Sequence, residues 1–151
     1  MDDLRDLYQE VILDHNRHPR NYGALDEASH HADGHNPLCG DQLRVHVAVE
    51  GDQVQDVRFE GTGCAISTAS ASLMTEAVKG RTREEAEVLF EGFHELLTGD
   101  PSQAGESSAQ LGKLAVFAGV REFPVRVKCA TLAWHTLQAA LEGTADPAST
   151  E

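Results

Sequence analysis

The sequence has few positively charged residues. Its 151 residues include 12 lysines and arginines against 25 aspartates and glutamates, which gives a formal net charge of −13. Nucleic acids and anionic membranes bind basic protein surfaces, so this balance argues against either of them as the main partner. We therefore expect neither nucleic acid nor a membrane among the partners of this protein.

Long apolar segments are also missing. No apolar run in the sequence approaches the ~18 residues that a transmembrane helix needs. The segment from Met1 to Glu10 is acidic and amphipathic, whereas a secretory leader combines basic residues with an apolar stretch. The sequence thus predicts a cytoplasmic protein.

Cysteine is scarce as well, with three residues in the chain. An odd number cannot form a complete set of disulfides, and three is too few for a disulfide-stapled secreted scaffold. In a reducing compartment, unpaired thiols are typical metal ligands or nucleophiles. The alternative is that they are small buried hydrophobic side chains, because free cysteine is among the most buried residue types.

Several site signatures are absent from the sequence. It has no C-x-x-C pair, which excludes a zinc ribbon or finger. It also lacks a Ser/His/Asp arrangement, a Gly-rich phosphate loop and a dinucleotide-binding fingerprint. His30, His31 and His35 fall in a segment rich in Gly, Asp and Asn, and we expect them to be solvated rather than metal-bound.

The first half of the chain combines a helical pattern with an alternating pattern. Apolar residues at helical spacing predict a helix that begins at Asp2 or Asp3 and stops within residues 16–21. A long polar loop is expected from Gly23 to about Pro37. Alternating apolar residues then predict a β-hairpin of two strands over 43–49 and 54–60, followed by a short third strand over 61–66.

The second half of the chain is predicted to be mostly helical. Ser67 or Thr68 would cap one helix, and the capping-box pair Thr82 and Glu85 would open the next. A short helix is expected near residues 111–118. A hairpin-centred sheet followed by helices is the pattern of an α+β domain.

The last helix has the clearest apolar face. That face runs from Ala130 to Leu141, and Gly143 is expected to end the helix. The residues beyond it are small and polar. We therefore predict one domain over residues 1–143 and a disordered tail over 144–151.

Each cysteine stands at the predicted start of an element. Cys39 precedes the first strand of the hairpin, Cys64 lies between a strand and a helix, and Cys129 opens the last helix. Asp41 follows Cys39 by two residues, so both side chains point the same way if the segment is extended. Three thiolates and one carboxylate would complete a tetrahedral zinc shell if the fold brought them together. The alternative for Asp41 is a turn or cap residue before the strand.

The three segments around the cysteines resemble those of a known family. They read N-P-L-C-G-D at 36–41, G-T-G-C-A-I-S at 61–67 and R-V-K-C-A-T-L-A-W at 126–134. In this order they resemble the SufU/IscU (NifU N-terminal-like) family of iron–sulfur cluster assembly proteins, over nearly the whole chain. The resemblance implies an α+β fold with a three-stranded antiparallel sheet and packed helices. It also implies one surface-exposed metal site formed by Cys39, Asp41, Cys64 and Cys129.

Three features resemble the SufU branch of this family more than the IscU branch. IscU scaffolds usually carry a histidine ligand directly before the third cysteine, where this chain has Lys128, which cannot bind a metal while protonated. The proline-rich, chaperone-recognised segment of IscU is reduced here to Phe123-Pro124-Val125. The stretch between Cys64 and Cys129 is also longer than in IscU.

The SufU resemblance implies a zinc-dependent sulfurtransferase. Such a protein takes persulfide sulfur from a SufS-type cysteine desulfurase and hands it to a SufB-containing assembly complex. Cys39 corresponds to the sulfur acceptor, and Arg126 is expected to be a cation near the thiolates or a docking residue, with a plain surface charge as its alternative. Two other functions stay open. The protein could be a scaffold for an iron–sulfur cluster, because thiolates also bind such clusters, or a structural zinc or thiol protein that acts as a binding module.

Overall fold

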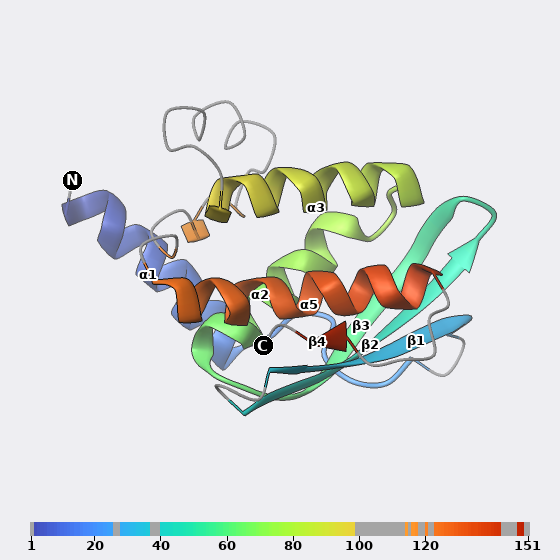
Figure 1. The fold of residues 1–151 in the computed structure, drawn as a ribbon, viewed down its shortest axis with the longest axis horizontal. Helices are drawn as coiled ribbons and strands as arrows, with labels where there is room; N and C mark the ends of the chain where they lie inside the picture. Colours follow the sequence, from blue (N-terminus) through green and yellow to red (C-terminus); the bar gives the residue numbers. More distant parts are fainter. Residues whose placement is uncertain are drawn as a thin grey trace.

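The architecture is that of an α+β protein, with helices stacked on one face of a sheet (Figure 1). A computed structural model describes residues 2–25, 28–36, 40–98, 114, 116, 117, 120, 123–142, 148 and 149. These residues form four α-helices and a sheet with the strand order β3-β2-β1-β4. The predicted fold class is confirmed.

The hairpin is formed by β2 (Asp41–Glu50) and β3 (Gln53–Thr62), as the alternation predicts. Their antiparallel register pairs Val45 with Phe59 and Val47 with Val57. All four of these side chains are buried, because the inner face of the hairpin lies under the helices. The inner face of the hairpin therefore forms the sheet side of the hydrophobic core.

The third antiparallel strand is β1 (His30–Asn36), in the segment that we expected to be a polar loop. The prediction was wrong because neither face of β1 shows an apolar pattern. Its buried positions are Ala32, Gly34 and Asn36, and its outward positions are all polar. The predicted short strand over 61–66 is also wrong, since β3 continues to Thr62 and a helix begins at Ala65.

A two-residue strand, β4 (Ala148–Ser149), pairs with β1 in parallel. These are the only residues of the segment 144–151 that the structure describes, so the predicted tail otherwise lies outside the described residues. The predicted helix near 111–118 is likewise described only at Leu114, Val116 and Phe117, all of which are buried.

The helices form two layers above the sheet (Figure 1). Helix α5 (Pro124–Glu142) packs on β1 and β2, and α2 (Ala65–Val78) packs on both α5 and β3. Helix α3 (Arg83–Thr98) covers α5 from the other side, where Phe93 stacks on Trp134 with the ring centroids 5.2 Å apart. Helix α1 (Asp2–Arg17) packs on α2.

The start of α3 follows the predicted capping box. Thr82 Oγ1 accepts the Glu85 backbone N–H, and the Thr82 backbone N–H donates to Glu85 Oε1, both at 3.1 Å. The hydrogen bonds from Thr82 hold the pKa of the Glu85 carboxyl below its usual value. Ala86, Phe93, Leu96 and Leu97 of this helix face the core.

No helix among the described residues combines the length and the apolar character that a membrane crossing requires.

Helix α5 approaches the sheet closely at Gly34 of β1. A Cβ atom at this position would collide with Thr136 Oγ1, and it would lie 3.2 Å from Leu132 Cδ1. Thr136 is fully buried, and its hydroxyl donates to the Leu132 carbonyl at 2.7 Å. Only glycine lets α5 lie this close to β1.

Gly34→Ala is therefore expected to destabilise the protein by about 1–3 kcal/mol, the usual effect of overpacking a closed core. Thr136→Ala removes the colliding oxygen, so the double variant should be more stable than the sum of the two single effects predicts. Urea unfolding of the wild type, both single variants and the double variant measures this coupling. Strictly additive effects, or a neutral Gly34→Ala, would contradict the close packing.

Candidate metal centre

Three of the four predicted metal ligands meet at one end of the sheet. One ligand atom from each of Asp41, Cys64 and Cys129 lies within 4.8 Å of the other two. Asp41 and Cys129 are fully buried, and Cys64 is partly exposed. We call these residues the three-ligand cluster. Among the described residues, it is the group of three or more His, Cys, Asp or Glu side chains that could hold a metal ion.

The register of the strands brings these residues together. Asn36 at the end of β1 pairs with Asp41 at the start of β2, and Thr62 at the end of β3 pairs with Gln42. The chain thus returns to the level of Asp41 just before it reaches Cys64. Because α5 lies across β1 and β2, Cys129 is added to the same end of the sheet.

Cys64 is the N-cap residue of α2. Its backbone is extended (φ −71°, ψ 169°), and its Sγ accepts the backbone N–H of Ser67 at 3.5 Å. The predicted cap at Ser67 or Thr68 is therefore wrong, because the sulfur itself takes the capping position that serine or threonine oxygens usually occupy. Helix N-termini favour negatively charged groups, so this is a suitable position for a thiolate ligand.

Asp41 is held by a backbone donor from a distant part of the chain. Its Oδ1 accepts the backbone N–H of Cys64 at 2.9 Å, while its Oδ2 lies 4.0 Å from Cys64 Sγ. This contact fixes the carboxylate orientation and leaves Oδ2 on the side of the sulfur. The carboxylate thus binds the backbone of the residue that directly precedes α2.

Cys129 lies in the second turn of α5, not at its start as we expected. The prediction was wrong because the first turn, from Pro124 to Val127, lies outside the apolar face on which the helix was predicted. Proline is well suited to the first position of a helix. The Asn36 amide donates to Cys129 Sγ at 3.7 Å, so the buried sulfur has a polar neighbour on β1.

Of the two other predicted site residues, the structure describes Arg126 but not Cys39. Cys39 lies outside the described residues. Arg126 is exposed in the first turn of α5, where its backbone N–H donates to the Phe123 carbonyl. Lys128 is partly exposed on the same helix, directly before Cys129.

The sequence did not identify Asn36 and Ser67 as residues of the site, although both contact the three-ligand cluster. A signal for Ser67 was available, because the third residue after an N-cap is the position whose backbone N–H the cap accepts. No such signal exists for Asn36, since its contact with Cys129 depends on how α5 crosses β1.

The donor atoms of the cluster fit a zinc ion. Thiolates and carboxylates are both zinc ligands, and bonds of ~2.0–2.3 Å in a tetrahedral site put the ligand atoms roughly 3.5–3.8 Å apart. The spacing of the cluster atoms, within 4.8 Å, is close to this requirement. The Ser67 hydroxyl next to the cluster is buried and has no hydrogen-bond partner, which is a second indication that a group is expected here.

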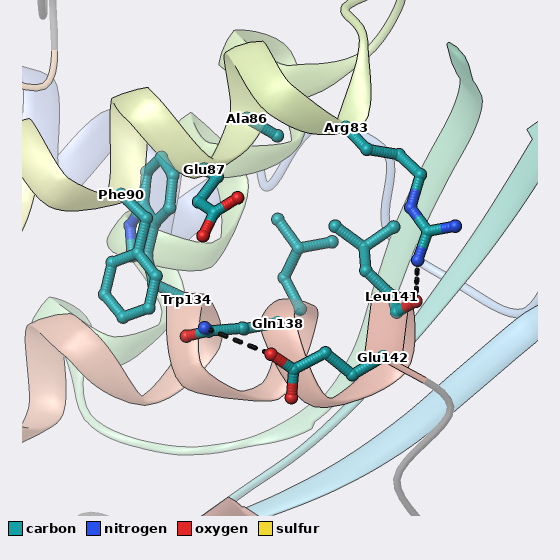
Figure 2. Close-up of a pocket in the computed structure, with 9 residues that line it drawn as sticks. Arg83, Ala86, Glu87, Phe90, Trp134, Gln138, Leu141 and Glu142 are labelled. Carbon is teal, nitrogen blue, oxygen red and sulfur yellow. Dashed lines mark hydrogen bonds between the residues drawn. The ribbon is translucent and has the colours of Figure 1, made fainter. Parts of the chain in front are cut away.

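A separate pocket lies between α3 and α5, lined by side chains such as Phe90, Trp134 and Gln138 (Figure 2). The Gln138 amide donates to Glu142 Oε1 at 3.4 Å, and the Arg83 guanidinium donates to the Leu141 carbonyl. Both of these hydrogen bonds lie along the wall of the pocket. None of its lining residues belongs to the three-ligand cluster, so the metal-ligating chemistry described above lies elsewhere.

Comparison with known proteins places the chain in a family. The model of the NifU-like N-terminal domain matches residues 7–130. The chain is 44% identical over 135 residues to the zinc-dependent sulfurtransferase SufU of Bacillus subtilis, with 89% of each protein covered. It is 41% identical over 143 residues to the iron–sulfur cluster assembly scaffold protein IscU of Streptococcus pyogenes, with 95% of this chain and 87% of that protein covered.

The fold agrees with this assignment. A crystal structure from Fervidobacterium islandicum, of a protein assigned to iron–sulfur cluster assembly in the SUF system, superposes with a TM-score of 0.79. The two chains are 34% identical, and the match covers 87% of this chain and 94% of the other. The family that the three cysteine motifs indicate is confirmed, and this chain belongs to the family of NifU-like N-terminal domains.

Proposed function

We propose that the protein is a zinc-dependent sulfurtransferase in iron–sulfur cluster biogenesis. It would accept persulfide sulfur from a SufS-type cysteine desulfurase and pass it to a SufB-containing assembly complex. The observation that carries this proposal is the convergence of Asp41, Cys64 and Cys129 on one point with the donor types that zinc prefers. The 44% identity to a zinc-dependent sulfurtransferase supports the same function.

Cys39 is proposed as the fourth ligand and as the sulfur acceptor. Covalent geometry supports this position, because two residues of chain span at most about 7 Å and Cys39 precedes Asp41 by two. The other two thiols are less suited to accept sulfur. Cys129 is fully buried, and the sulfur of Cys64 is the cap of α2.

The transfer step uses the thiolate of Cys39 as a nucleophile. It attacks the outer sulfur of the desulfurase persulfide, and a new S–S bond forms on Cys39. The bond between the two partner sulfurs breaks, and its electron pair leaves with the desulfurase cysteine as a thiolate. A bound zinc ion would keep the ligand thiols deprotonated near neutral pH.

The ligands have different tasks in this scheme. Asp41, Cys64 and Cys129 would hold the metal throughout, because backbone and side-chain donors fix all three in place. Cys39 would complete the ligand set and would also supply the nucleophilic thiolate to the docked desulfurase. Arg126, exposed one turn before Cys129, would contact the desulfurase or the transferred sulfur.

A scaffold function is the second candidate. The 41% identity to an IscU scaffold favours it, and thiolates also bind iron–sulfur clusters. Lys128 weighs against it, because a protonated lysine cannot be a metal ligand. The two functions differ in what the purified protein contains.

The purified protein is expected to be colourless and to hold about one zinc per chain, as a single tetrahedral site requires. Elemental analysis and visible absorption spectra of the untagged protein measure this. Cys64→Ser and Cys129→Ser should each lower the zinc content. A brown protein that transfers an intact cluster to an acceptor would favour the scaffold, and a protein without zinc would reject the sulfurtransferase.

Addition of the wild-type protein is expected to raise the turnover of a SufS-type desulfurase, and Cys39→Ala should abolish this effect. The reason is that Cys39 would be the group that removes the persulfide. Mass spectrometry of the alkylated protein after turnover should find the additional sulfur on Cys39. Equal labelling of Cys64 and Cys39, or no stimulation by the wild type, would contradict the assignment.

Arg126→Ala is expected to weaken stimulation of the desulfurase several-fold without changing the zinc content. Its guanidinium is exposed and would act on the partner or the transferred group rather than on the fold. Arg44→Ala is the matched control, because that arginine is about half exposed on the sheet and pairs with Asp33. Equal effects of the two substitutions would show that Arg126 has no specific role.

A further inference from the structure

Ser67 of α2 has a hydroxyl that lacks a partner. The residue is fully buried, and among the described residues only Ser67 Oγ and Trp134 Nε1 are buried side-chain atoms without a hydrogen bond. A buried hydroxyl without a partner is unfavourable, and folded proteins contain few of them. The position of this hydroxyl therefore requires a reason.

The hydroxyl lies beside the three-ligand cluster. A Cβ atom built on Gly63 would be 2.9 Å from Asp41 Oδ1 and 3.2 Å from Ser67 Oγ. The carboxylate and the hydroxyl thus border the same small space, which exists because residue 63 has no side chain. The backbone N–H of Ser67 also donates to Cys64 Sγ at 3.5 Å.

The two oxygens of Asp41 face different neighbours. Oδ1 already accepts the Cys64 backbone N–H at 2.9 Å, whereas Oδ2 is the oxygen nearer to Cys64 Sγ. A second donor on Oδ1 would lock the carboxylate so that Oδ2 points at the position between the sulfurs. Metal-bound carboxylates are normally held by such additional hydrogen bonds.

We propose that Ser67 is a positioning residue of the metal centre, whose hydroxyl donates to Asp41 Oδ1 when the ion is bound. This inference rests on the proposed zinc site. The hydroxyl lacks a partner without the ion and gains one when ion binding draws Oδ2 toward the metal and turns Oδ1 to Ser67. Gly63 serves the same purpose by leaving room for both groups, since its backbone is not in the left-handed region that would itself require glycine.

Ser70 provides a matched control on the same helix. It lies one turn after Ser67 and is equally buried, but its hydroxyl donates to the Ala130 carbonyl of α5 at 2.5 Å. Removing the Ser70 hydroxyl breaks an existing hydrogen bond between two helices. Removing the Ser67 hydroxyl breaks no hydrogen bond in the metal-free protein. Loss of the Ser70 hydroxyl should therefore mainly affect stability, whereas loss of the Ser67 hydroxyl should mainly affect zinc binding.

The experiment compares Ser67→Ala and Ser70→Ala with the wild type in the full chain. Ser67→Ala is expected to leave the urea midpoint of the metal-free protein unchanged or higher, and to lower the zinc association constant 10- to 100-fold in competition with a chelator. Ser70→Ala should lower the urea midpoint of the metal-free protein and change the zinc association constant much less. The rate of zinc release into excess chelator, measured on loaded protein, needs no folded metal-free state and should rise only for Ser67→Ala.

Cobalt substitution gives a spectroscopic test of the same contact. The ligand-field bands of bound Co²⁺ should shift in Ser67→Ala, because the carboxylate ligand is less firmly oriented, and should keep their position in Ser70→Ala. Wild-type zinc affinity and an unchanged cobalt spectrum in Ser67→Ala would overturn the role of Ser67 and leave the zinc site intact. A wild-type protein that binds no zinc would overturn the proposed function as well, and the two failures are therefore distinguishable.

Discussion

One hydrogen bond at the three-ligand cluster joins β2 of the sheet to the start of α2. The backbone N–H of Cys64 donates to Asp41 Oδ1 at 2.9 Å, which connects the start of α2 to the start of β2. Asp41 is fully buried, and a buried carboxylate is tolerated only where donors or a cation compensate for the lost water. The same bond turns Oδ2 toward Cys64 Sγ. The orientation of the carboxylate and the position of the sulfur thus depend on each other.

Cys129 reaches the three-ligand cluster because small residues allow α5 to pack closely on β1 and α2. Glycine at position 34 lets α5 lie against β1 next to Thr136, and Asn36 on the same strand contacts Cys129 Sγ. On α2, the buried Ser70 donates to the backbone of α5, which a larger side chain would hold farther away. The Ala- and Ser-rich composition of α2 is therefore part of how the site is built, rather than only a property of the core.

The sequence predicts those parts of the fold in which one face is apolar and the other polar. The hairpin of β2 and β3 and the capping box at Thr82 belong to this class. Strand β1 could not be predicted, because its buried side consists of Ala32, Gly34 and Asn36 and carries no hydrophobic signal. The early start of α5 was missed for a related reason, since its first turn lies outside the apolar face. In both cases tertiary packing, not local pattern, decides the structure.

The candidate site was more accessible to prediction than strand β1 beside it. Cys64, Cys129 and Asp41 are chemically distinctive residue types, whereas the groups that orient them, Asn36 and Ser67, are common types whose role depends on geometry. The central claim is a zinc centre of three sulfur ligands and one carboxylate oxygen. X-ray absorption at the zinc edge of the loaded protein tests it most directly. We predict three sulfur neighbours at ~2.3 Å and one oxygen neighbour at ~2.0 Å, and a shell with fewer than three sulfurs or with imidazole scattering would contradict it.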